Sequence, residues 1–239
     1  LEYLKRRKFK TVTLRDVLEH IRGERKLPPR SVALTFDDGY LDNWTIVAPM
    51  LKQHGFCGTV FVNPEFVDQR DIIRKQIRNP EDSPTKDMID GFMSWPELKA
   101  VDHSRIFDVQ SHGMTHTWYF KSDKIIDFHH PGDNYPWLAW NARPDRKYLW
   151  LEEDQSEIVG YGAPVFEYEK AMIVRRCIPV TDFNEKMTRY VAENGRVAFF
   201  QKLEWRDLLL RKAETIEADF QYESEEQYRK RVEWELSAS

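Results

Sequence analysis

The chain has 239 residues, of which 41% are hydrophobic and 13% aromatic, a composition that can bury a sizeable core and excludes a disordered or fibrous protein. Its 36 basic and 40 acidic residues are mixed along the chain and give a formal net charge of -4. No basic stripe is available for a phosphate backbone, so we expect no nucleic-acid partner.

The first half of the chain predicts helices and strands in alternation. Apolar residues three and four apart indicate amphipathic helices, whereas short apolar runs indicate buried strands. The predicted elements are helices over 14–21, 43–55 and 94–101, strands over 31–36, 58–62 and 106–110, and a polar loop over 63–91 with one short helix. Asn43 is a candidate N-cap, Gly55 a C-terminal stop, and Ser94 with Glu97 has the pattern of a capping box. This alternation predicts a parallel sheet or barrel with helices packed outside.

The chain changes character after the third predicted strand. Residues 117–162 are rich in Pro, Asn, Asp and Trp and show no sustained period, which predicts an irregular excursion. Helices over 182–195 and 204–214 and a last one within 224–239 follow it. Aromatic faces in the excursion suit sugar rings and suit a hydrophobic core equally well, so both roles stay open. These aromatic residues are Trp118, Tyr135, Trp137, Trp140, Tyr148, Trp150 and Tyr161.

Two adjacent carboxylates, Asp37 and Asp38, follow the first predicted strand and precede Gly39. Reactive groups collect at the carboxyl ends of the strands in parallel sheets and barrels. Neighbours in a regular strand point to opposite faces, so both acids can serve one site only if the chain bends there, which Gly39 makes sterically cheap. The alternative is that one Asp caps the next turn and the other is solvated.

Two histidines, His112 and His116, come directly after the third predicted strand. Their spacing of four residues places two imidazoles on one face of a helical turn. With a carboxylate from a neighbouring strand they offer two nitrogens and one oxygen to a divalent ion and leave one position for water, as in catalytic zinc sites. The alternative is a pair of histidines that cap or pack.

The two motifs in this order, "TFDDG" at 35–39 and "SHGMTH" at 111–116, resemble those of the polysaccharide deacetylases, the NodB-type fold of carbohydrate esterase family four. The resemblance implies an α/β fold, a distorted (β/α) barrel of the NodB deacetylase type, with a long irregular insertion. Because few strands are predicted, we expect that barrel to be incomplete. It also implies that Asp37 is the catalytic base. Asp38, His112 and His116 then hold one divalent metal ion, with zinc favoured and cobalt, nickel or iron also compatible.

The resemblance further implies a single deacetylase domain over 1–239 with an insertion at about 117–220. We expect a hydrolase that removes N-acetyl groups from an N-acetylated sugar in a polysaccharide or glycan precursor. The alternative is a catalytically impaired glycan-binding member of the same fold. A phosphoesterase is a third class, but it would need a second ion and further ligands that the sequence does not offer.

Two motifs of the family are not visible in the sequence. The family supplies its general acid as a late histidine after a "PxG" motif, whereas the last histidine here is His130 and no PxG follows it. We therefore expect an N-terminal portion of a longer deacetylase that binds a metal and turns over poorly. If it turns over normally, the acid must be sought at His103, His129 or His130.

Little in the sequence bears on the compartment or on redox chemistry. No run of about 18 apolar residues is present to span a bilayer, and the opening "LEYLKRRKFK" lacks the apolar core of a signal peptide. The first residue is Leu rather than Met, so residues can precede it. The compartment stays open, with the cytoplasm favoured. Cys57 and Cys177 lack a CxxC spacing, and we expect free thiols.

Overall fold

The computed structural model describes residues 1–77 and 83–239, and the described chain divides into two compact units. The first unit comprises Leu1–Thr115, Tyr148–Glu152 and Ser239, and the second comprises His116–Lys147 and Glu153–Ala238. The single domain and the limits expected for an insertion stay predictions. Residues 78–82 of the predicted polar loop lie outside the described residues.

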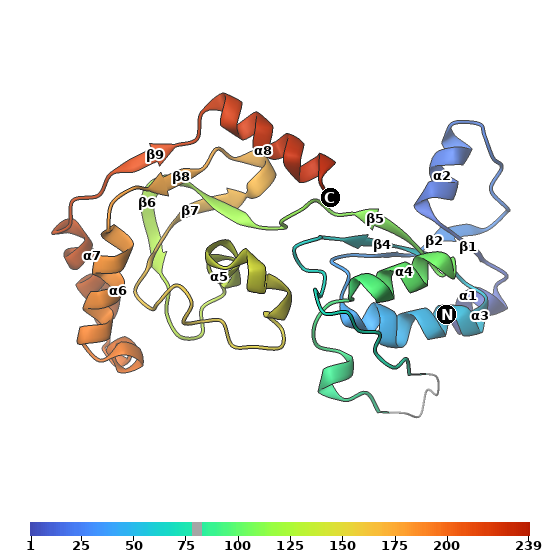
Figure 1. Ribbon diagram of the computed structural model, residues 1–239, viewed down its shortest axis with the longest axis horizontal. Helices are drawn as coiled ribbons and strands as arrows, with labels where there is room; N and C mark the ends of the chain where they lie inside the picture. The colour runs from blue at the N-terminus through green and yellow to red at the C-terminus, as the bar shows by residue number, and fades with distance from the viewer. Residues whose placement is uncertain (78–82) are drawn as a thin grey trace. The chain divides into compact units, whose positions relative to one another are not determined.

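The first unit is an α/β arrangement of short parallel strands with helices beside them (Figure 1). The strands form a pair, β1-β2, and a three-stranded sheet in the order β3-β4-β5, all parallel. The strands are β1 Lys10–Val12, β2 Ser31–Ala33, β3 Thr35–Phe36, β4 Gly58–Val62 and β5 Phe107–Ser111. The helices are α1 Glu2–Arg6, α2 Leu14–Ile21, the π-helix η1 Asn43–Val47, α3 Ala48–His54, the 3-10 turn η2 Lys86–Met88 and α4 Trp95–His103. The predicted alternation is confirmed, except that the apolar run 31–36 is divided between two sheets.

One hydrophobic core joins α3 and α4 to the sheet. Leu51 of α3, Leu98 of α4 and Val60 of β4 belong to it, and each is at most 3% exposed. Burying a leucine or valine side chain contributes about 1.5–3 kcal/mol relative to leaving it in water. These contacts fix the sheet whose carboxyl edge carries the predicted acids and histidines.

The helix ends follow the predicted signals in most places. Gly55 ends α3 in a left-handed conformation, with φ 66°, and Ser94 and Glu97 form the predicted capping box at the start of α4. The prediction for Asn43 is wrong. It is the first residue of η1 and is buried, and no side-chain cap precedes this helix.

The second unit is built on antiparallel pairs rather than on a parallel sheet. β6 pairs with β7, and β8 pairs with β9. The strands are β6 Trp118–Phe128, β7 Pro164–Lys170, β8 Cys177–Pro179 and β9 Phe220–Tyr222. The helices are α5 Pro136–Ala142, α6 Phe183–Glu193, α7 Trp205–Glu214 and α8 Glu225–Ser237, with 3-10 turns η3 Pro144–Leu149, η4 Ala171–Ile173 and η5 Arg196–Gln201. The three predicted helices correspond to α6, α7 and α8.

The expectation of an irregular excursion over 117–162 is wrong where β6 and α5 form. β6 is a strand of 11 residues. Its pairing with β7 shifts register between Phe120 and Ile125 and again between Ile125 and Asp127. Such bulges break the alternation of inward and outward side chains, so the sequence shows no period of two.

The aromatic residues of this segment do not share one role. Trp137 and Trp140 of α5 are 4% and 5% exposed, so these two side chains serve the core. The other five are half-buried. Packing is therefore the role of the α5 pair, and the rest keep one face near the surface.

The described residues form four separate sheets and no closed barrel. The α/β character expected from the sequence is present in the first unit, but the expected distorted barrel is not. The parallel order ends at β5, and the strands that follow pair antiparallel. Strands that pair antiparallel in separate two-stranded sheets do not extend the parallel sheet toward closure.

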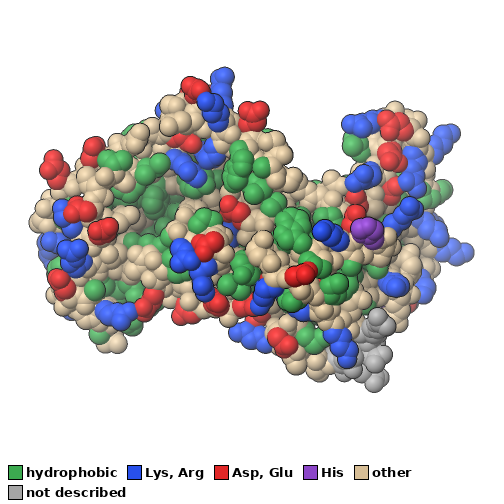
Figure 2. Space-filling view, in the orientation of Figure 1, with side chains coloured by type: hydrophobic (Ala, Val, Ile, Leu, Met, Phe, Trp, Pro, Cys, Tyr) green, Lys and Arg blue, Asp and Glu red, His purple; other side chains and the backbone are tan. Residues whose placement is uncertain are grey.

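The cysteines, the helices and the surface charges bear on three further expectations. Cys57 and Cys177 are free cysteines, as predicted. A search of the described helices finds none of the length and apolarity that crossing a membrane requires. Acidic and basic side chains are interspersed over the face seen in Figure 2, in line with the mixed charges of the sequence.

Candidate metal centre

The two predicted acids lie on a tight turn directly after β3. Asp38 and Gly39 are both left-handed, with φ 65° and 71°, and the amide of Gly39 donates to the carbonyl of Asp37 at 2.9 Å. A Cβ on Gly39 would lie 2.9 Å from Cγ1 of Val62, so this position accepts only glycine without movement. The chain thus leaves the pleat after β3, as expected. Asp37 is exposed, and Asp38 is half-buried.

The two predicted histidines lie on the turn that follows β5. The amide of His112 donates to the carbonyl of Val62 at 2.8 Å, which extends the ladder between β4 and β5. The side-chain amide of Asn63 donates to the carbonyls of His112 and Gly113, at 2.7 and 3.0 Å. Asn63 is fully buried, so it fixes the backbone of the histidine turn.

Asn63 was not predicted as a site residue, although a signal for it exists. It directly follows β4, just as Asp37 follows β3 and His112 follows β5. Polar residues immediately after three neighbouring parallel strands meet at one edge of a sheet. A search of every strand end would therefore have included Asn63.

Asp38, His112 and His116 come together as a group that can hold a metal ion. Each offers one ligand atom, and these atoms all lie within 4.8 Å of one another. The His112 Nε2 atom is 3.6 Å from Oδ1 of Asp38. Within residues 1–77 and 83–239 this is the one group of three or more His, Cys, Asp or Glu side chains with such geometry.

The donor set fits a divalent transition metal. Zinc binds imidazole nitrogen and carboxylate oxygen at about 2.0–2.2 Å, so two ligands of one ion lie about 3–4 Å apart, as His112 and Asp38 do. Two nitrogens and one oxygen also leave a coordination position for water or substrate. The side chains of His112 and Asp38 are 34% and 19% exposed, so small molecules can reach the group.

Backbone strain accompanies two of the three candidate ligands. Asp38 and His116 have φ of 65° and 42°, and neither is glycine. Such conformations cost on the order of 1 kcal/mol or more and persist where the surroundings impose them, most often at functional sites. Four other non-glycine residues, among them Lys8 and Arg105, share this conformation, so it does not by itself distinguish the two candidate ligands.

Burial and the acids change the proton affinity of two neighbours of the turn. Burial, and then the charge of Asp38, raise the pKa of the Tyr40 phenol. Burial raises the pKa of Asp42, and the hydrogen bond from the Asn43 amide opposes this only in part. The acidic turn is thus partly withdrawn from water.

The remaining candidate histidines have other partners. The Nδ1 atom of His103 donates to the carbonyl of Lys99 in the last turn of α4. His129 is buried, with Nδ1 bonded to Asp133 and Nε2 to the carbonyl of Ser156. His130 lies 3.8 Å from a carboxylate oxygen of Asp127. These histidines are outside the group described above, and the general acid stays unassigned.

The first unit has short parallel strands flanked by helices, so this is an α/β protein. One Asp and two His lie close together after these strands and form a candidate centre for one metal ion. The family follows from comparison with known proteins. The polysaccharide deacetylase family model matches residues 24–149, which is more than half of the chain. The chain belongs to this family, and the matched region contains both predicted motifs.

Individual proteins match the chain at low sequence identity. The chain is 28% identical over 116 residues to the poly-β-1,6-N-acetyl-D-glucosamine N-deacetylase of Escherichia coli strain K12. This alignment covers 48% of this chain and 16% of that protein. The chain therefore spans about a sixth of the length of this relative. Among solved structures, the BpsB deacetylase domain from Bordetella bronchiseptica has a TM-score of 0.40 and 23% identity, over 60% of this chain and 58% of that one. A de-N-acetylase from Aggregatibacter actinomycetemcomitans has a TM-score of 0.39 and 20% identity, over 51% of this chain and 45% of that one.

Proposed function

We propose that this protein removes acetyl groups from an N-acetylated sugar in a polysaccharide or glycan precursor. The observation that carries the proposal is the gathering of one carboxylate and two imidazoles, with ligand atoms within 4.8 Å, in a chain of the polysaccharide deacetylase family. Asp38, His112 and His116 would hold the ion, and Asp37 would act as the base. Among relatives, the E. coli protein is an N-deacetylase of poly-β-1,6-N-acetyl-D-glucosamine, and a β-1,6-linked N-acetylglucosamine chain is the first substrate to test.

Both reactants, the acetamide and the water molecule, must be activated. An acetamide is a poor electrophile, and water is a poor nucleophile at neutral pH. A bound divalent ion supplies Lewis-acid activation of the carbonyl and a lower pKa for water. The carboxylate of Asp37 accepts a proton from the attacking water as the new C–O bond forms. The C–N bond then breaks, and the amine must gain a proton, so the products are acetate and a free amino sugar.

The two acids differ in exposure, which supports different roles for them. Asp38 is half-buried beside His112, as a ligand should be, whereas Asp37 is exposed. Asp37 is outside the group of three ligand atoms, so its carboxylate would keep its lone pairs for a proton. Zinc is the favoured ion, and cobalt, nickel and iron accept the same donors.

The test compares the unmodified chain with Asp37→Asn. Acetate release from β-1,6-linked N-acetylglucosamine oligomers is followed over hours with zinc or cobalt added, and metal content is measured on the same samples. We expect Asp37→Asn to lower acetate release by about 100-fold or more, as loss of a general base does, while one ion per chain is kept. Asp102→Asn, an exposed acid on α4, is the matched control and should change neither quantity.

Two outcomes would contradict the proposal. Acetate release that is unchanged in Asp37→Asn would remove the base from the account. A chain that binds both the ion and the oligomer but releases no acetate at any metal concentration would be the glycan-binding alternative.

A further inference from the structure

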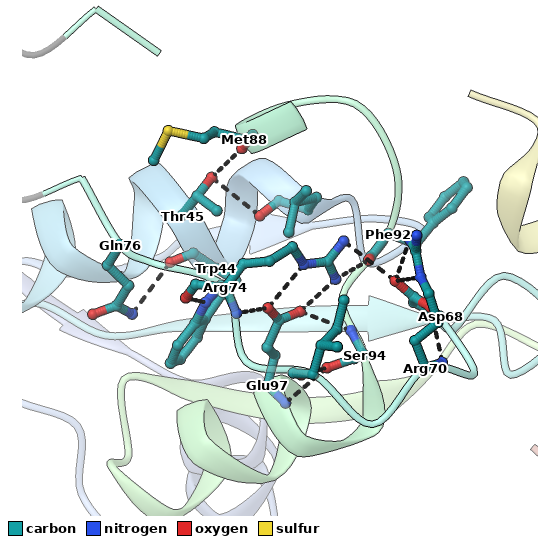
Figure 3. A network of polar contacts seen from close by, with 12 residues as sticks. Trp44, Thr45, Asp68, Arg70, Arg74, Gln76, Met88, Phe92, Ser94 and Glu97 are labelled. Carbon is teal, nitrogen blue, oxygen red and sulfur yellow. Dashed lines mark hydrogen bonds and ion pairs between the residues drawn. The ribbon is translucent and has the colours of Figure 1, made fainter. Parts of the chain in front are cut away.

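The first unit contains a buried network of ion pairs (Figure 3). At its centre are Asp68, Arg74 and Glu97, which we call the Arg74 clamp. Asp68 and Glu97 are 1% and 0% exposed, and the Arg74 side chain is 17% exposed. Carboxylates this deeply buried need partners for all their charge.

Glu97 is fully satisfied by two partners. Its carboxylate accepts hydrogen bonds from Nε and Nη2 of Arg74, at 3.0 and 2.6 Å, and from the Arg74 amide at 2.7 Å. It also accepts from the amide of Ser94 at 2.8 Å, as the capping box requires. This two-pronged geometry fits only arginine, because lysine is a point donor.

The clamp also holds the backbone of residues 91–94. Nη2 of Arg74 donates to the carbonyl of Phe92 at 2.7 Å, and Nη1 lies 3.3 Å from the Asp68 carboxylate. The amide of Asp68 in turn donates to the carbonyl of Met93 at 3.0 Å. Consecutive residues of this segment are therefore tied to the clamp by side chain and by backbone.

The other side of the same segment is bonded to the acidic turn. The amide of Met93 donates to the carbonyl of Gly39 at 2.9 Å, and the amide of Leu41 donates to the carbonyl of Gly91 at 2.9 Å. Tyr40 and Phe92 form an antiparallel bridge, and their rings stack with centroids 5.2 Å apart. One short segment thus connects the clamp to the residue that follows Asp38.

The chain around Arg74 is also bonded to the helix that follows the acidic turn. The indole of Trp44 donates to the carbonyl of Arg74 at 2.7 Å (Figure 3). The amide of Ile77 donates to the carbonyl of Thr45 at 2.8 Å. Both partners belong to η1, a π-helix just beyond the acidic turn. The segments that carry the Arg74 clamp are therefore bonded both to the end of the acidic turn and to the helix that follows it.

We propose that Arg74 and Glu97 are positioning residues that hold Asp38 in the conformation in which it binds the metal ion. Asp38 is left-handed without being glycine, and such a conformation persists only where its neighbours impose it. The bonds at Gly39 and Leu41 impose it, and the clamp fixes the segment that makes those bonds. This inference rests on the metal-binding part of the proposed function.

The experiment measures Co2+ binding to the full chain by its visible absorption, beside unfolding in urea. Arg74→Lys keeps the charge but loses the two-pronged bond, and Glu97→Gln keeps the shape but loses the charge. Outer partners of metal ligands typically contribute 10- to 100-fold to affinity, so we expect the Kd for Co2+ to rise about 10-fold or more in both variants. We also expect a changed Co2+ spectrum, because the geometry at Asp38 relaxes.

A core residue of the second unit provides the control for lost stability. Leu209 of α7 is 0% exposed and belongs to the hydrophobic core of that unit. Leu209→Ala should lose stability because it leaves a cavity, and it should keep the Kd and spectrum of the unmodified chain. Equal Kd values and spectra in Arg74→Lys and Leu209→Ala would overturn the positioning role and leave the proposed function intact. Failure of the unmodified chain to bind Co2+ would overturn both.

A second measurement needs no variant. If the clamp and the ion act on the same backbone, binding must slow hydrogen exchange at the Met93 amide, because coupling is reciprocal. We expect Zn2+ to slow exchange there at least several-fold and to leave the Val180 amide, which donates to the carbonyl of Asp219 in the second unit, unchanged. Equal exchange at Met93 with and without Zn2+ would contradict the inference.

Discussion

A buried arginine–glutamate pair lies in each of the two units, and the backbone around the pairs differs. In the first unit, Arg74 and Glu97 hold residues 91–94, which bond to the turn after Asp38. In the second, Arg231 of α8 bonds to Glu223 and to two carbonyls of the segment after β7. The chemistry of the pairs is the same, and each holds backbone next to a candidate ligand, since the amide of Ala171 donates to the carbonyl of Thr117, which follows His116. The pairs differ in the number of these bonds, because residues 91–94 make two backbone bonds to the turn after Asp38, whereas Ala171 makes one to Thr117. We therefore expect the first pair to affect the candidate ligands more strongly than the second.

The largest effects should come from the cores of the two units. Phe107 of β5 and Phe166 of β7 are each 1% exposed, and each belongs to the core of its own unit. Replacing either by alanine should cost about 3–5 kcal/mol of unfolding free energy, because a cavity replaces a buried ring. Urea unfolding followed by tryptophan fluorescence measures this. If the units unfold separately, each variant shifts one transition, whereas a shared shift would show that they unfold together.

Glycines that require positive φ give a sharper comparison. Gly39 in the first unit and Gly132 in the second have φ of 71° and 81°, but an added Cβ meets Val62 only at Gly39. Gly132→Ala should cost about 1–2 kcal/mol from the left-handed conformation alone. Gly39→Ala should cost a further 1–3 kcal/mol or so from overpacking and should also weaken Co2+ binding. Equal costs at the two positions would mean that the acidic turn yields without strain.

The smallest effect concerns a buried pair of the second unit that responds to pH. Burial opposes the charge on His129, but its bonds to Asp133 and to the Ser156 carbonyl, with the charge of Asp133, outweigh this and raise the pKa of His129. Burial likewise acts to raise the pKa of Asp133, but the bond from His129 and backbone amides lower it overall. The His129 contribution is therefore complete below its ordinary pKa of about 6.5 and lost as pH rises through the higher folded value, and the Asp133 contribution is present above about 3.9.

His129→Gln tests this dependence. The unfolding free energy lost in the variant should be larger near pH 6 than near pH 9, by about 1 kcal/mol. His103→Gln, which removes an exposed histidine from the first unit, is the control. A loss that grows with pH would contradict the account, because the sign follows from a raised pKa.

The motifs of the first unit could be predicted because each directly follows a short strand of the parallel sheet. The apolar runs before Asp37 and His112 mark strand ends, and parallel strands bring those ends to one edge. The Arg74 clamp could not be predicted, since Arg74 and Glu97 are 23 positions apart across a polar segment that shows no period. Only the folded backbone brings them together.

In the second unit α6, α7 and α8 could be predicted, whereas α5 and the strands could not. The helices α6 and α7 carry continuous amphipathic patterns, which depend only on local spacing. β6 depends on a partner strand that begins at Pro164, and its bulges hide the alternation. The absence of a closed barrel among the described residues could not be predicted for the same reason. Sheet closure depends on pairings between distant strands, which local spacing does not reveal.

The most direct test of the account is the binding of zinc to the unmodified chain and to His112→Ala and His116→Ala. The account predicts one ion per chain, and in each variant a rise in Kd of more than about 100-fold, beyond the range of outer-partner substitutions. Binding of no ion by the unmodified chain, or binding by the two variants as strong as that by the unmodified chain, would contradict a metal centre formed by Asp38 and the two histidines.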